Sequence, residues 1–482
     1  MGEEVLDLLE DDARQVLRFG DIRIIGEGRV DGHADQLLVA AMLVFQIEHA
    51  DRTGPHHAAG NEGAARNDQR VERVAIGRKR VRHEAVVRRI AHWRVQDAVD
   101  EQRAAGLVEF VFDRFAAGRH LDDDIEALGI SLAQSVFNCR FANIQSTSGT
   151  VSNIGALKAL AKPGDKITAV STADGGHISH ARMGAVGLRG LDLTTYPWDV
   201  DRMEPDVDAA CAMIREVEPT LALVGQSVFL FPTPLQEMAD AAHEVGAQVM
   251  YDGAHVLGLI AGGQFQDPLR EGADIVTGSS HKTFPGPQGG FILSNSDDEK
   301  FHRKLNSAIF PGVCSSYHLH HVAGKVIALA EFAEYGAAYA EDIVRNAKAF
   351  GAAMASEGFD VLAEGRGYTA SHQILTRHGD TDSGAGAKAA QLLEDAGIIT
   401  NMNMLPGDTK AMTPSGLRLG VQELTRVGMG ATQMEEVAHL YARVLLKGDD
   451  TTSVKADVTA LKSEFQTIRY CFNEDSVSGY PL

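Results

Sequence analysis

One stretch, Asp274 to Gly290, constrains the fold of this chain more than any other part of the sequence. The apolar run Ala273 to Thr277 at its start predicts a short buried strand. Small hydroxyl residues follow, then His281 and Lys282, and then a turn rich in proline and glycine. In α/β proteins, ligands bind beyond the carboxyl ends of the strands. The position of Lys282 therefore predicts a lysine that takes part in a ligand site.

Polar side chains follow two other predicted strands in the same way. Asp252 and His255 come after the apolar run Ala247 to Met250, and Ser227 follows the strand before that. Because the carboxyl ends of parallel strands meet at one edge of a sheet, we expect these side chains to lie near Lys282. Lysine, aspartate and histidine would then form one constellation.

Pyridoxal phosphate chemistry requires this set of side chains. A lysine amine condenses with the cofactor aldehyde to form a Schiff base. An aspartate beside the pyridine nitrogen keeps that nitrogen protonated, so that the ring accepts electrons. The phosphate needs backbone N–H groups at a helix N-terminus. Ser148, Gly149 and Thr150 precede the predicted helix Val151 to Ala161 and can supply them.

Composition excludes several other classes of protein. The net charge of −21 argues against binding to nucleic acid and to anionic membranes. Four scattered cysteines without a CxxC pair predict neither a disulfide framework nor a zinc site, and they suit a reducing cytosol. The sequence contains no run of eighteen apolar residues, so we expect no membrane span. The acidic start of the chain lacks a signal-peptide pattern, so we expect a cytoplasmic protein.

Strand-like runs and amphipathic helices alternate from Asp122 onward, which predicts an α/β fold. We expect a large, mostly parallel sheet domain over residues 122–318 and a long linking helix over 319–357. A small C-terminal α+β domain is expected over 358–448 and a helical tail over 449–482.

Residues 1–121 do not fit this pattern. The first 120 residues hold 17 arginines, one lysine and none of the nine tyrosines of the chain. Asp51 to Arg82 is polar and aperiodic, which predicts disorder. Two interpretations remain open: a replaced or mis-framed stretch, or a genuine extra domain of unknown role.

The motifs from Asp252 to His255 (Asp-Gly-Ala-His) and from Ser279 to Lys282 (Ser-Ser-His-Lys) resemble serine hydroxymethyltransferase, a fold-type-I pyridoxal-phosphate enzyme. The Gly-Pro-Gln-Gly-Gly segment that follows Lys282 resembles the same family, and further motifs keep the family's order from about residue 122 to 446. The stretch Gly367 to His372 is similar to a less typical branch, among which are enzymes acting on α-methylserine.

The resemblance implies a role for each matching residue. Lys282 bonds the cofactor, Asp252 pairs with the ring nitrogen, and His177 stacks on the ring; we expect these three to be catalytic. Arg418 grips the substrate carboxylate by a two-pronged hydrogen bond. The other implied cofactor ligands are Ser148, Gly149, Thr150 and His281 around the phosphate, with His255, Ser227 and Ser279. Asn401 and Asn403 match polar positions near the folate site.

Simpler interpretations stand beside these roles. Asp252 could cap a helix that begins near Ala254, and His177 could be an ordinary polar helix residue. Arg418 could form a surface ion pair. His318, His320 and His321 suggest metal binding by composition, but no carboxylate lies at ligand spacing, so we interpret them as polar residues at a helix start and predict no metal site.

Two departures from the family pattern concern a partner subunit. Where the family has a Gly-Gly pair that reaches the partner's phosphate, this chain has Ser315 and Ser316. The family also carries a Tyr/Glu/Tyr segment in its N-terminal part that completes the partner's site, and residues 1–120 contain nothing similar.

The resemblance implies reversible transfer of a hydroxymethyl group between serine (or α-methylserine) and glycine (or alanine). Tetrahydrofolate would carry the one-carbon unit, and the assembly would be a homodimer or homotetramer. Two alternatives stay open: a folate-independent aldolase of β-hydroxy amino acids, and a homologue that binds pyridoxal phosphate without turnover.

Overall fold

The computed structural model describes residues 121–472, all of which belong to one compact unit. The predictions made for residues 1–120, and the last ten residues of the predicted tail, lie outside the described residues. The domain limits given above remain predictions.

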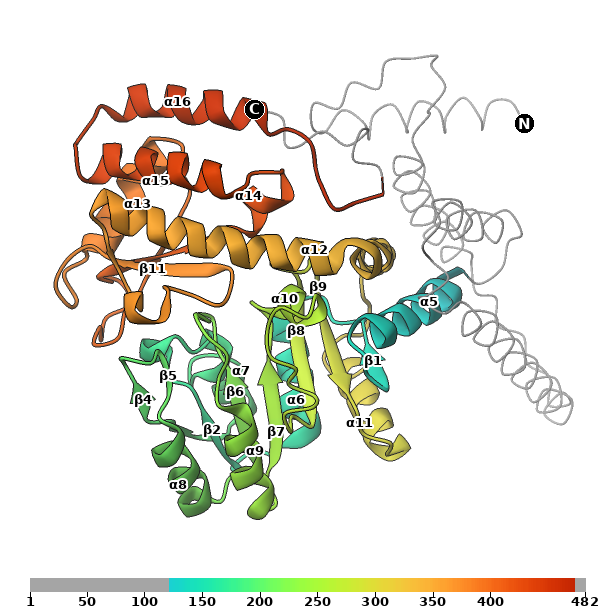
Figure 1. The fold of residues 1–482 in the computed structure, drawn as a ribbon. Helices are drawn as coiled ribbons and strands as arrows, with labels where there is room; N and C mark the ends of the chain where they lie inside the picture. Colours follow the sequence, from blue (N-terminus) through green and yellow to red (C-terminus); the bar gives the residue numbers. More distant parts are fainter. Residues whose placement is uncertain (1–120, 473–482) are drawn as a thin grey trace, which may run out of the picture. The chain divides into compact units, whose positions relative to one another are not determined.

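A seven-stranded sheet forms the larger part of the described chain (Figure 1). Five adjacent strands of this sheet, β8, β7, β6, β2 and β3, run parallel to one another. Strand β9 is antiparallel to both of its neighbours, β8 and β1. A large, mostly parallel sheet is therefore confirmed. Across the sheet, the strands are β1 (Phe141–Asn143), β9 (Pro285–Ser294), β8 (Ile275–His281), β7 (Gln248–Asp252), β6 (Leu221–Gly225), β2 (Lys166–Ala169) and β3 (Asp192–Thr195).

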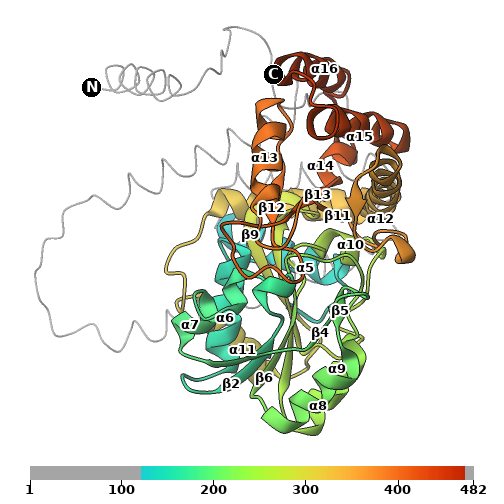
Figure 2. The same cartoon turned by 90° about the vertical axis from the view of Figure 1, so that its left-hand side faces the viewer.

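Helices cover both faces of this sheet, as buried parallel strands require. Side chains of a strand alternate between the faces. On β6, Leu221 and Leu223 pack in one apolar cluster, whereas Ala222 and Val224 pack in another. The first cluster includes residues of α6 (Gly149–Leu160), α7 (Ala185–Arg189) and α11 (Glu299–Ile309). The second includes residues of α5 (Leu121–Val136), α8 (Val207–Val217), α9 (Leu235–Glu244) and α10 (Leu257–Ala261). In Figure 2, α6 and α9 lie on opposite sides of the strands.

The prediction for the stretch around Lys282 was wrong in one respect. Strand β8 continues to His281, and the proline- and glycine-rich residues that follow Lys282 begin strand β9 instead of forming a turn. Gly290 pairs with Ser279, and a register shift separates this pair from His281. Gly290 suits this strand because a Cβ there would lie only 2.5 Å from the carbonyl oxygen of Ser148. Lys282 thus lies at the tip of a hairpin.

A long helix, α12 (Leu319–Glu357), connects the large sheet to a second, four-stranded sheet. This smaller sheet is antiparallel, in the order β10 (Asp360–Val361), β11 (Gln373–Arg377), β13 (Gly416–Gly420) and β12 (Asn401–Asn403). Helices α13 (Ala385–Asp395) and α15 (Ala431–Leu445) belong to the same part of the chain as this smaller sheet. The predicted long helix and α+β unit are both present.

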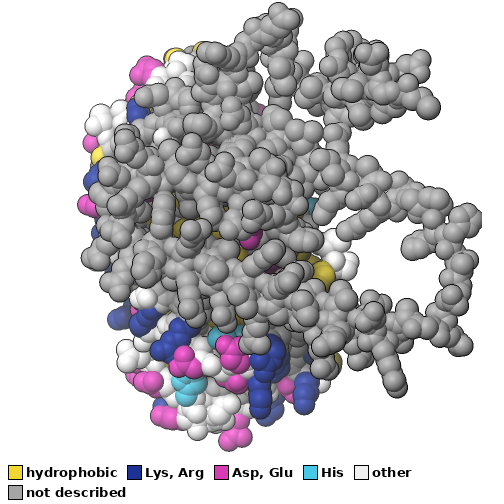
Figure 3. Space-filling view, turned by 90° about the vertical axis from the view of Figure 1, so that its right-hand side faces the viewer, with side chains coloured by type: hydrophobic (Ala, Val, Ile, Leu, Met, Phe, Trp, Pro, Cys, Tyr) yellow, Lys and Arg dark blue, Asp and Glu magenta, His cyan; other side chains and the backbone are white. Residues whose placement is uncertain are grey.

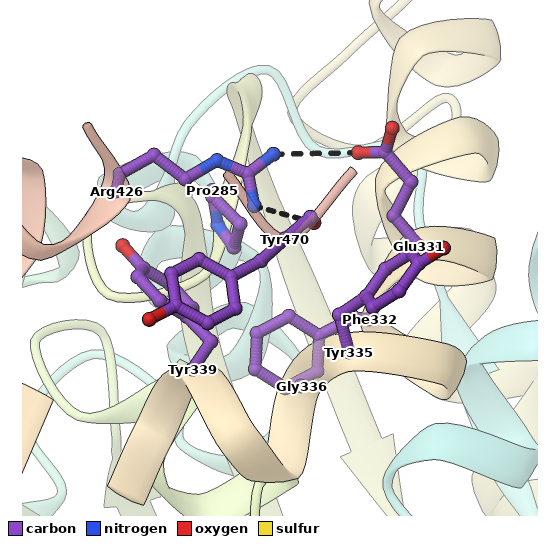
Figure 4. Close-up of a pocket in the computed structure, with 8 residues that line it drawn as sticks. All are labelled: Pro285, Glu331, Phe332, Tyr335, Gly336, Tyr339, Arg426 and Tyr470. Carbon is purple, nitrogen blue, oxygen red and sulfur yellow. Dashed lines mark hydrogen bonds and ion pairs between the residues drawn. The ribbon is translucent and has the colours of Figure 1, made fainter. Parts of the chain in front are cut away.

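The C-terminal part of the described chain is attached to α12 through Arg426. This arginine ends α14 (Gln422–Arg426), donates a hydrogen bond of 2.8 Å to the carbonyl oxygen of Tyr470, and lies 3.4 Å from a carboxylate oxygen of Glu331 on α12 (Figure 4). The predicted tail helix is α16 (Thr451–Glu464), which ends earlier than the apolar spacing predicted.

The described surface carries charge of both signs. On the face shown in Figure 3, basic and acidic side chains of the described residues lie next to one another. Within residues 121–472, none of the helices combines the length and the apolar character that crossing a membrane requires.

Candidate active site

The carboxylate of Asp252 lies at the centre of the predicted site. Asp252 ends β7 and is only 3% exposed. Its Oδ2 accepts hydrogen bonds from Nδ2 of Asn153 at 2.7 Å and from Nε2 of His180 at 2.8 Å. Its Oδ1 accepts one from the backbone N–H of Ala254 at 3.0 Å. The capping interpretation is wrong, because α10 begins only at Leu257 with Val256 as its N-cap, and Oδ1 instead closes a short turn after β7. Oδ2 faces side chains from two other elements.

Asp252 is ionised although it is buried. Burial alone would raise its pKa, but the hydrogen bonds that His180 and Asn153 donate lower the pKa below the ordinary aspartate value. A buried carboxylate of this kind stabilises a positively charged partner. The protonated ring nitrogen of pyridoxal phosphate is such a partner, so this residue fits the cofactor.

A chain of hydrogen bonds leads from the sheet to His177. The hydroxyl of Thr277 donates to Oδ1 of Asn153 at 2.7 Å, and Nδ2 of Asn153 donates to the hydroxyl of Ser179 at 2.9 Å. The backbone N–H and the hydroxyl of Ser179 both lie within hydrogen-bond distance of Nδ1 of His177, at 3.1 and 2.7 Å. Since the backbone N–H can only donate, Nδ1 is the acceptor and the proton of the neutral ring is on Nε2.

His177 is also kept uncharged. Burial lowers its pKa to about 4, and this outweighs the opposite effect of Asp252. A neutral, planar imidazole held by Nδ1 can lie against a flat ligand without adding a positive charge. This agrees with a stacking role and not with that of an ordinary helix residue, because His177 precedes the short helix η3 (Ile178–His180) as its N-cap.

Lys282 and Arg418 bring two positive charges to the same place. Burial lowers the pKa of Lys282, Asp252 raises it by its negative charge, and Arg418 lowers it by its positive charge. A lowered pKa increases the fraction of free amine, which is the nucleophilic form. Arg418 lies on β13 of the smaller sheet, and its Nη1 donates to the carbonyl oxygen of Ser227 at 3.2 Å.

Arg418 has spare hydrogen-bonding capacity. Burial lowers its pKa, and among residues 121–472 no carboxylate forms a salt bridge with it. A half-buried guanidinium without a carboxylate partner suits an anionic substrate group. The surface ion-pair interpretation is not supported. Asn401 is its register neighbour on β12, and the side chain of Asn403 donates to the carbonyl oxygen of Met404.

His255 is held by a glutamine that sequence reasoning missed. Nε2 of Gln373 lies 3.2 Å from Nδ1 of His255 and donates to the carbonyl oxygen of Ser227 at 3.1 Å. Because an amide N–H₂ donates, Nδ1 of His255 accepts and its Nε2 carries the proton. Burial lowers the pKa of His255 well below its ordinary value. The buried His372 stacks on it, with ring centroids 6.1 Å apart and an interplanar angle of 17°.

The predicted phosphate turn, Ser148 to Thr150, packs on β8, the strand that leads to Lys282. Ser148 is the N-cap of α6, and its hydroxyl accepts from the backbone N–H of Val151 at 3.2 Å. A Cβ at Gly149 would overlap the hydroxyl of Ser279, so this close approach requires glycine. Thr150 and His281 are exposed, and within residues 121–472 their side chains form no hydrogen bond with Asp252 or His177.

The remaining predicted residues lie around the start of α12. Ser315 and Ser316 are exposed in the segment between α11 and α12. His318 is the N-cap of α12, and His320 and His321 follow in its first turn, so these histidines do mark a helix start.

Another set of side chains has the spacing of a metal site. Ligand atoms of His177, His180 and Asp252 lie within 4.8 Å of one another. The carboxylate oxygen Oδ2 of Asp252 already accepts two hydrogen bonds, and Nδ1 of His177 accepts from Ser179. The three side chains are thus already linked by hydrogen bonds to one another or to Ser179 among the described residues.

The site residues that the sequence analysis did not predict share one property. They are polar side chains where the local pattern calls for apolar ones, as in the middle of the helix that holds Asn153 or at the start of the strand that holds Gln373. A buried polar residue needs a hydrogen-bond partner. This signal was available for Asn153, Gln373 and His372, but it does not identify the partner.

Comparison with known proteins agrees with this site. A model of the family described as serine hydroxymethyltransferase matches residues 108–441. Curated serine hydroxymethyltransferases from Pyrococcus horikoshii, Thermococcus gammatolerans and Methanocella arvoryzae are 52%, 51% and 50% identical to this chain over 364, 372 and 372 residues. The matches cover 75–77% of this chain and 85–86% of the relatives.

A solved structure adds a comparison of the fold. The crystal structure of L-threonine transaldolase from Pseudomonas fluorescens is similar to this chain with a TM-score of 0.67 and 27% sequence identity, and the match covers 73% of this chain and 79% of that one. The family match spans well over half of the chain, and the curated relatives are about half identical to it. This chain therefore belongs to the serine hydroxymethyltransferase family of fold-type-I, pyridoxal-phosphate-dependent transferases.

Proposed function

We propose that this chain transfers a hydroxymethyl group reversibly between serine and glycine, with pyridoxal phosphate as cofactor and tetrahydrofolate as one-carbon carrier. One observation carries the proposal: the buried, ionised Asp252 shares a site with Lys282, whose pKa is lowered, and with Arg418, which lacks a carboxylate partner among the described residues. The names of the similar curated proteins support the choice of serine as substrate.

The cofactor would be held by residues from both sheets and from α6. Lys282 supplies the amine that bonds it, Asp252 faces its ring nitrogen, and His177 covers its ring. We further assign Ser148, Gly149, Thr150, Ser279 and His281 to the phosphate region, and Ser227 and His255 to the side of the ring hydroxyl. When bound, pyridoxal phosphate supplies a protonated ring that accepts the electron pair released from Cα of the amino acid.

Four side chains of the site have different roles in the proposed reaction. Oδ2 of Asp252 favours a proton on the opposing ring nitrogen by direct Coulomb attraction. Arg418 binds the substrate carboxylate through its planar fork and so orients Cα. His255 presents an Nε2–H donor because Gln373 occupies its Nδ1. Lys282 would present its amine to the cofactor in the uncharged, nucleophilic form, because burial lowers its pKa.

A second function shares the same three residues. A folate-independent aldolase of β-hydroxy amino acids would also need Lys282, Asp252 and Arg418. The similarity to a threonine transaldolase supports this second function. The substrate could also be α-methylserine, which would give alanine. Product analysis with serine, threonine and α-methylserine, each with and without tetrahydrofolate, separates these functions. Glycine formation from serine that requires tetrahydrofolate supports the proposal, and equal turnover without it supports the aldolase.

The assignment of Lys282 is tested directly. Borohydride reduction of the purified protein, followed by peptide mass spectrometry, should place the reduced cofactor adduct on Lys282. In Lys282→Ala the adduct should disappear, because no other amine lies at this position. An adduct on a different lysine would overturn the assignment.

We also propose a cytoplasmic homodimer or homotetramer. The family pattern in which a partner's residues complete the phosphate site supports an oligomer, and the exposed Ser315 and Ser316 would then take the place of the family's Gly-Gly pair. Sedimentation of the purified protein tests the assembly. A single species with the mass of one chain would contradict it.

A further inference from the structure

The structure contains a fully buried lysine that the proposed reaction does not use. Lys325 lies on α12 and is 1% exposed. We propose that Lys325 is a positioning residue, which holds the phosphate turn before α6 against the β8–β9 hairpin and thereby sets the affinity for pyridoxal phosphate. This inference rests on the proposed function.

On one side, Lys325 binds the chain that leads into the phosphate turn. Its Nζ donates to the carbonyl oxygens of Ile144 and Ser146, the second at 3.5 Å. Ser146 lies two residues before Ser148, the N-cap of α6. The carbonyl oxygen of Ser146 also accepts the backbone N–H of Gly290 at 2.9 Å. The turn, α12 and β9 therefore meet at this one carbonyl group.

On the other side, Lys325 packs on the hairpin that carries Lys282. Its Nζ lies 5.6 Å from the ring centroid of Phe291. A Cβ at Gly289 would come within 2.9 Å of the same Nζ. One turn earlier on α12, Nδ1 of His321 lies 2.9 Å from the carbonyl oxygen of Gln288, to which it donates. The first two turns of α12 thus hold the returning strand of the hairpin.

The charge of Lys325 also suits an anion at the adjacent turn. Burial lowers its pKa to about 7, while Glu126 on α5 and Cys314 raise it. A nearby phosphate would favour the charged form of the amine, and the N-terminus of α6 attracts the same phosphate. Burying this side chain is costly unless it is hydrogen-bonded, which explains why both carbonyl groups converge on it.

The test compares two buried polar residues of the same helix. Lys325→Met keeps most of the volume but removes the side-chain donor from both carbonyl groups, so that Ser146 keeps only the N–H of Gly290. Asn346→Leu is the matched control, because Asn346 is also 1% exposed on α12 and donates to Thr425 and to the carbonyl oxygen of Met429, far along the chain from the phosphate turn. The readouts are the dissociation constant of pyridoxal phosphate, titrated into apoprotein, and the thermal midpoint of each apoprotein.

We expect both variants to lower the thermal midpoint. Only Lys325→Met should weaken cofactor binding, by about tenfold or more, whereas Asn346→Leu should stay within about twofold of the unchanged protein. Equal cofactor affinity in Lys325→Met and the unchanged protein would overturn the inference. An equal loss in both variants would also overturn it, because the effect would then be general destabilisation.

A second variant covers the case in which Lys325→Met does not fold. Gly289→Ala keeps the lysine but places a Cβ 2.9 Å from the position of its Nζ and 2.9 Å from the hydroxyl of Ser280, so the ammonium group or that hydroxyl must shift. Ser280→Ala with Gly289→Ala removes the second contact and leaves only the displacement of Lys325. Weaker binding of pyridoxal phosphate supports the inference, and unchanged binding contradicts it. Failure of the proposed function is distinguishable, because the unchanged protein would then form no reducible cofactor adduct at Lys282.

Discussion

At the scale of single residues, the site depends on charges that persist although they are buried. Asp252 stays ionised because donors from α6 and from η3 reach one of its oxygens. His177 stays neutral because burial outweighs the attraction of that carboxylate, and His255 stays neutral because burial and the nearby positive charges of Lys282 and Arg418 all lower its pKa. One residue is thus stabilised in its charged form and its neighbours in their uncharged form, which is the arrangement that a cationic ring beside Asp252 requires.

Replacement of this carboxylate tests that arrangement. Asp252→Asn has nearly the same shape but loses the negative charge, so we expect pyridoxal phosphate still to bind while kcat falls by roughly 10²–10³-fold. Steady-state kinetics and the visible absorbance of the bound cofactor provide the two readouts. Activity equal to that of the unchanged protein would remove Asp252 from the mechanism.

Arg418 should act on substrate binding. Arg418→Lys keeps the positive charge but loses the planar fork, so the KM for the amino acid should rise by about tenfold or more while the cofactor spectrum stays unchanged. Arg377→Lys is the control, because Arg377 lies on the neighbouring strand β11 and pairs with Asp360 at 3.5 Å. A KM that changes equally in both variants would argue against a carboxylate-binding role.

At the scale of elements, the site depends on how closely α6 approaches the hairpin. The N-terminus of α6 can lie against β8 because Gly149 has no side chain to meet Ser279. The hairpin in turn presents Lys282 at its tip, whereas the smaller sheet contributes Arg418 from β13. Three elements that are far apart in the sequence therefore have to be placed correctly for a single cofactor.

The close approach of α6 can be tested by adding one methyl group. Gly149→Ala should push the helix start away from β8 and weaken binding of pyridoxal phosphate by about tenfold, since small displacements in an active site are costly. Gly365→Ala is the matched control, because no atom lies within 4 Å of the Cβ that it would add. Titration of the apoproteins with the cofactor gives the result, and equal affinities would contradict the packing argument.

At the scale of the whole molecule, the buried histidines link stability to pH. Burial lowers the pKa of His177 to about 4 and that of His372 to about 3, below the ordinary histidine value of about 6.5. Between pH 6.5 and 4 the unfolded chain therefore binds protons that the folded chain does not. The free energy of unfolding should fall as pH falls through this window, by about 1.4 kcal/mol per pH unit for each such histidine.

Urea unfolding of the apoprotein at several pH values between 7 and 4.5 measures this slope. The variant His372→Gln removes one of these groups, so its stability should depend less steeply on pH by about one proton. The ionised Asp252 contributes little here, because its stabilising charge is lost only at lower pH. Identical slopes in the variant and the unchanged protein would show that His372 is protonated in the folded state.

How far the site could be predicted differs from residue to residue. Lys282, Asp252 and His255 follow apolar runs that are short enough to be strands, so the edge of the sheet was predictable from periodicity alone. The hairpin after Lys282 was not, because prolines and glycines normally indicate turns, and the close approach of Ser148 and Ser152 that requires glycine at Gly290 appears only in the folded chain. Gln373 and Asn153 could be recognised as unusual, but His255 and Asp252, which they contact in the site, lie 118 and 99 residues away from them.

The sequence by itself determined the class of fold and the cofactor chemistry. Alternating periodicity specifies a parallel sheet covered by helices, and local motifs place lysine and aspartate at strand ends. Only the tertiary structure decided the protonation states, the tautomers of His177 and His255, and the buried position of Lys325. The physical reason is that periodicity acts over a few residues, whereas burial and hydrogen bonds join groups from elements that meet only after the chain has folded.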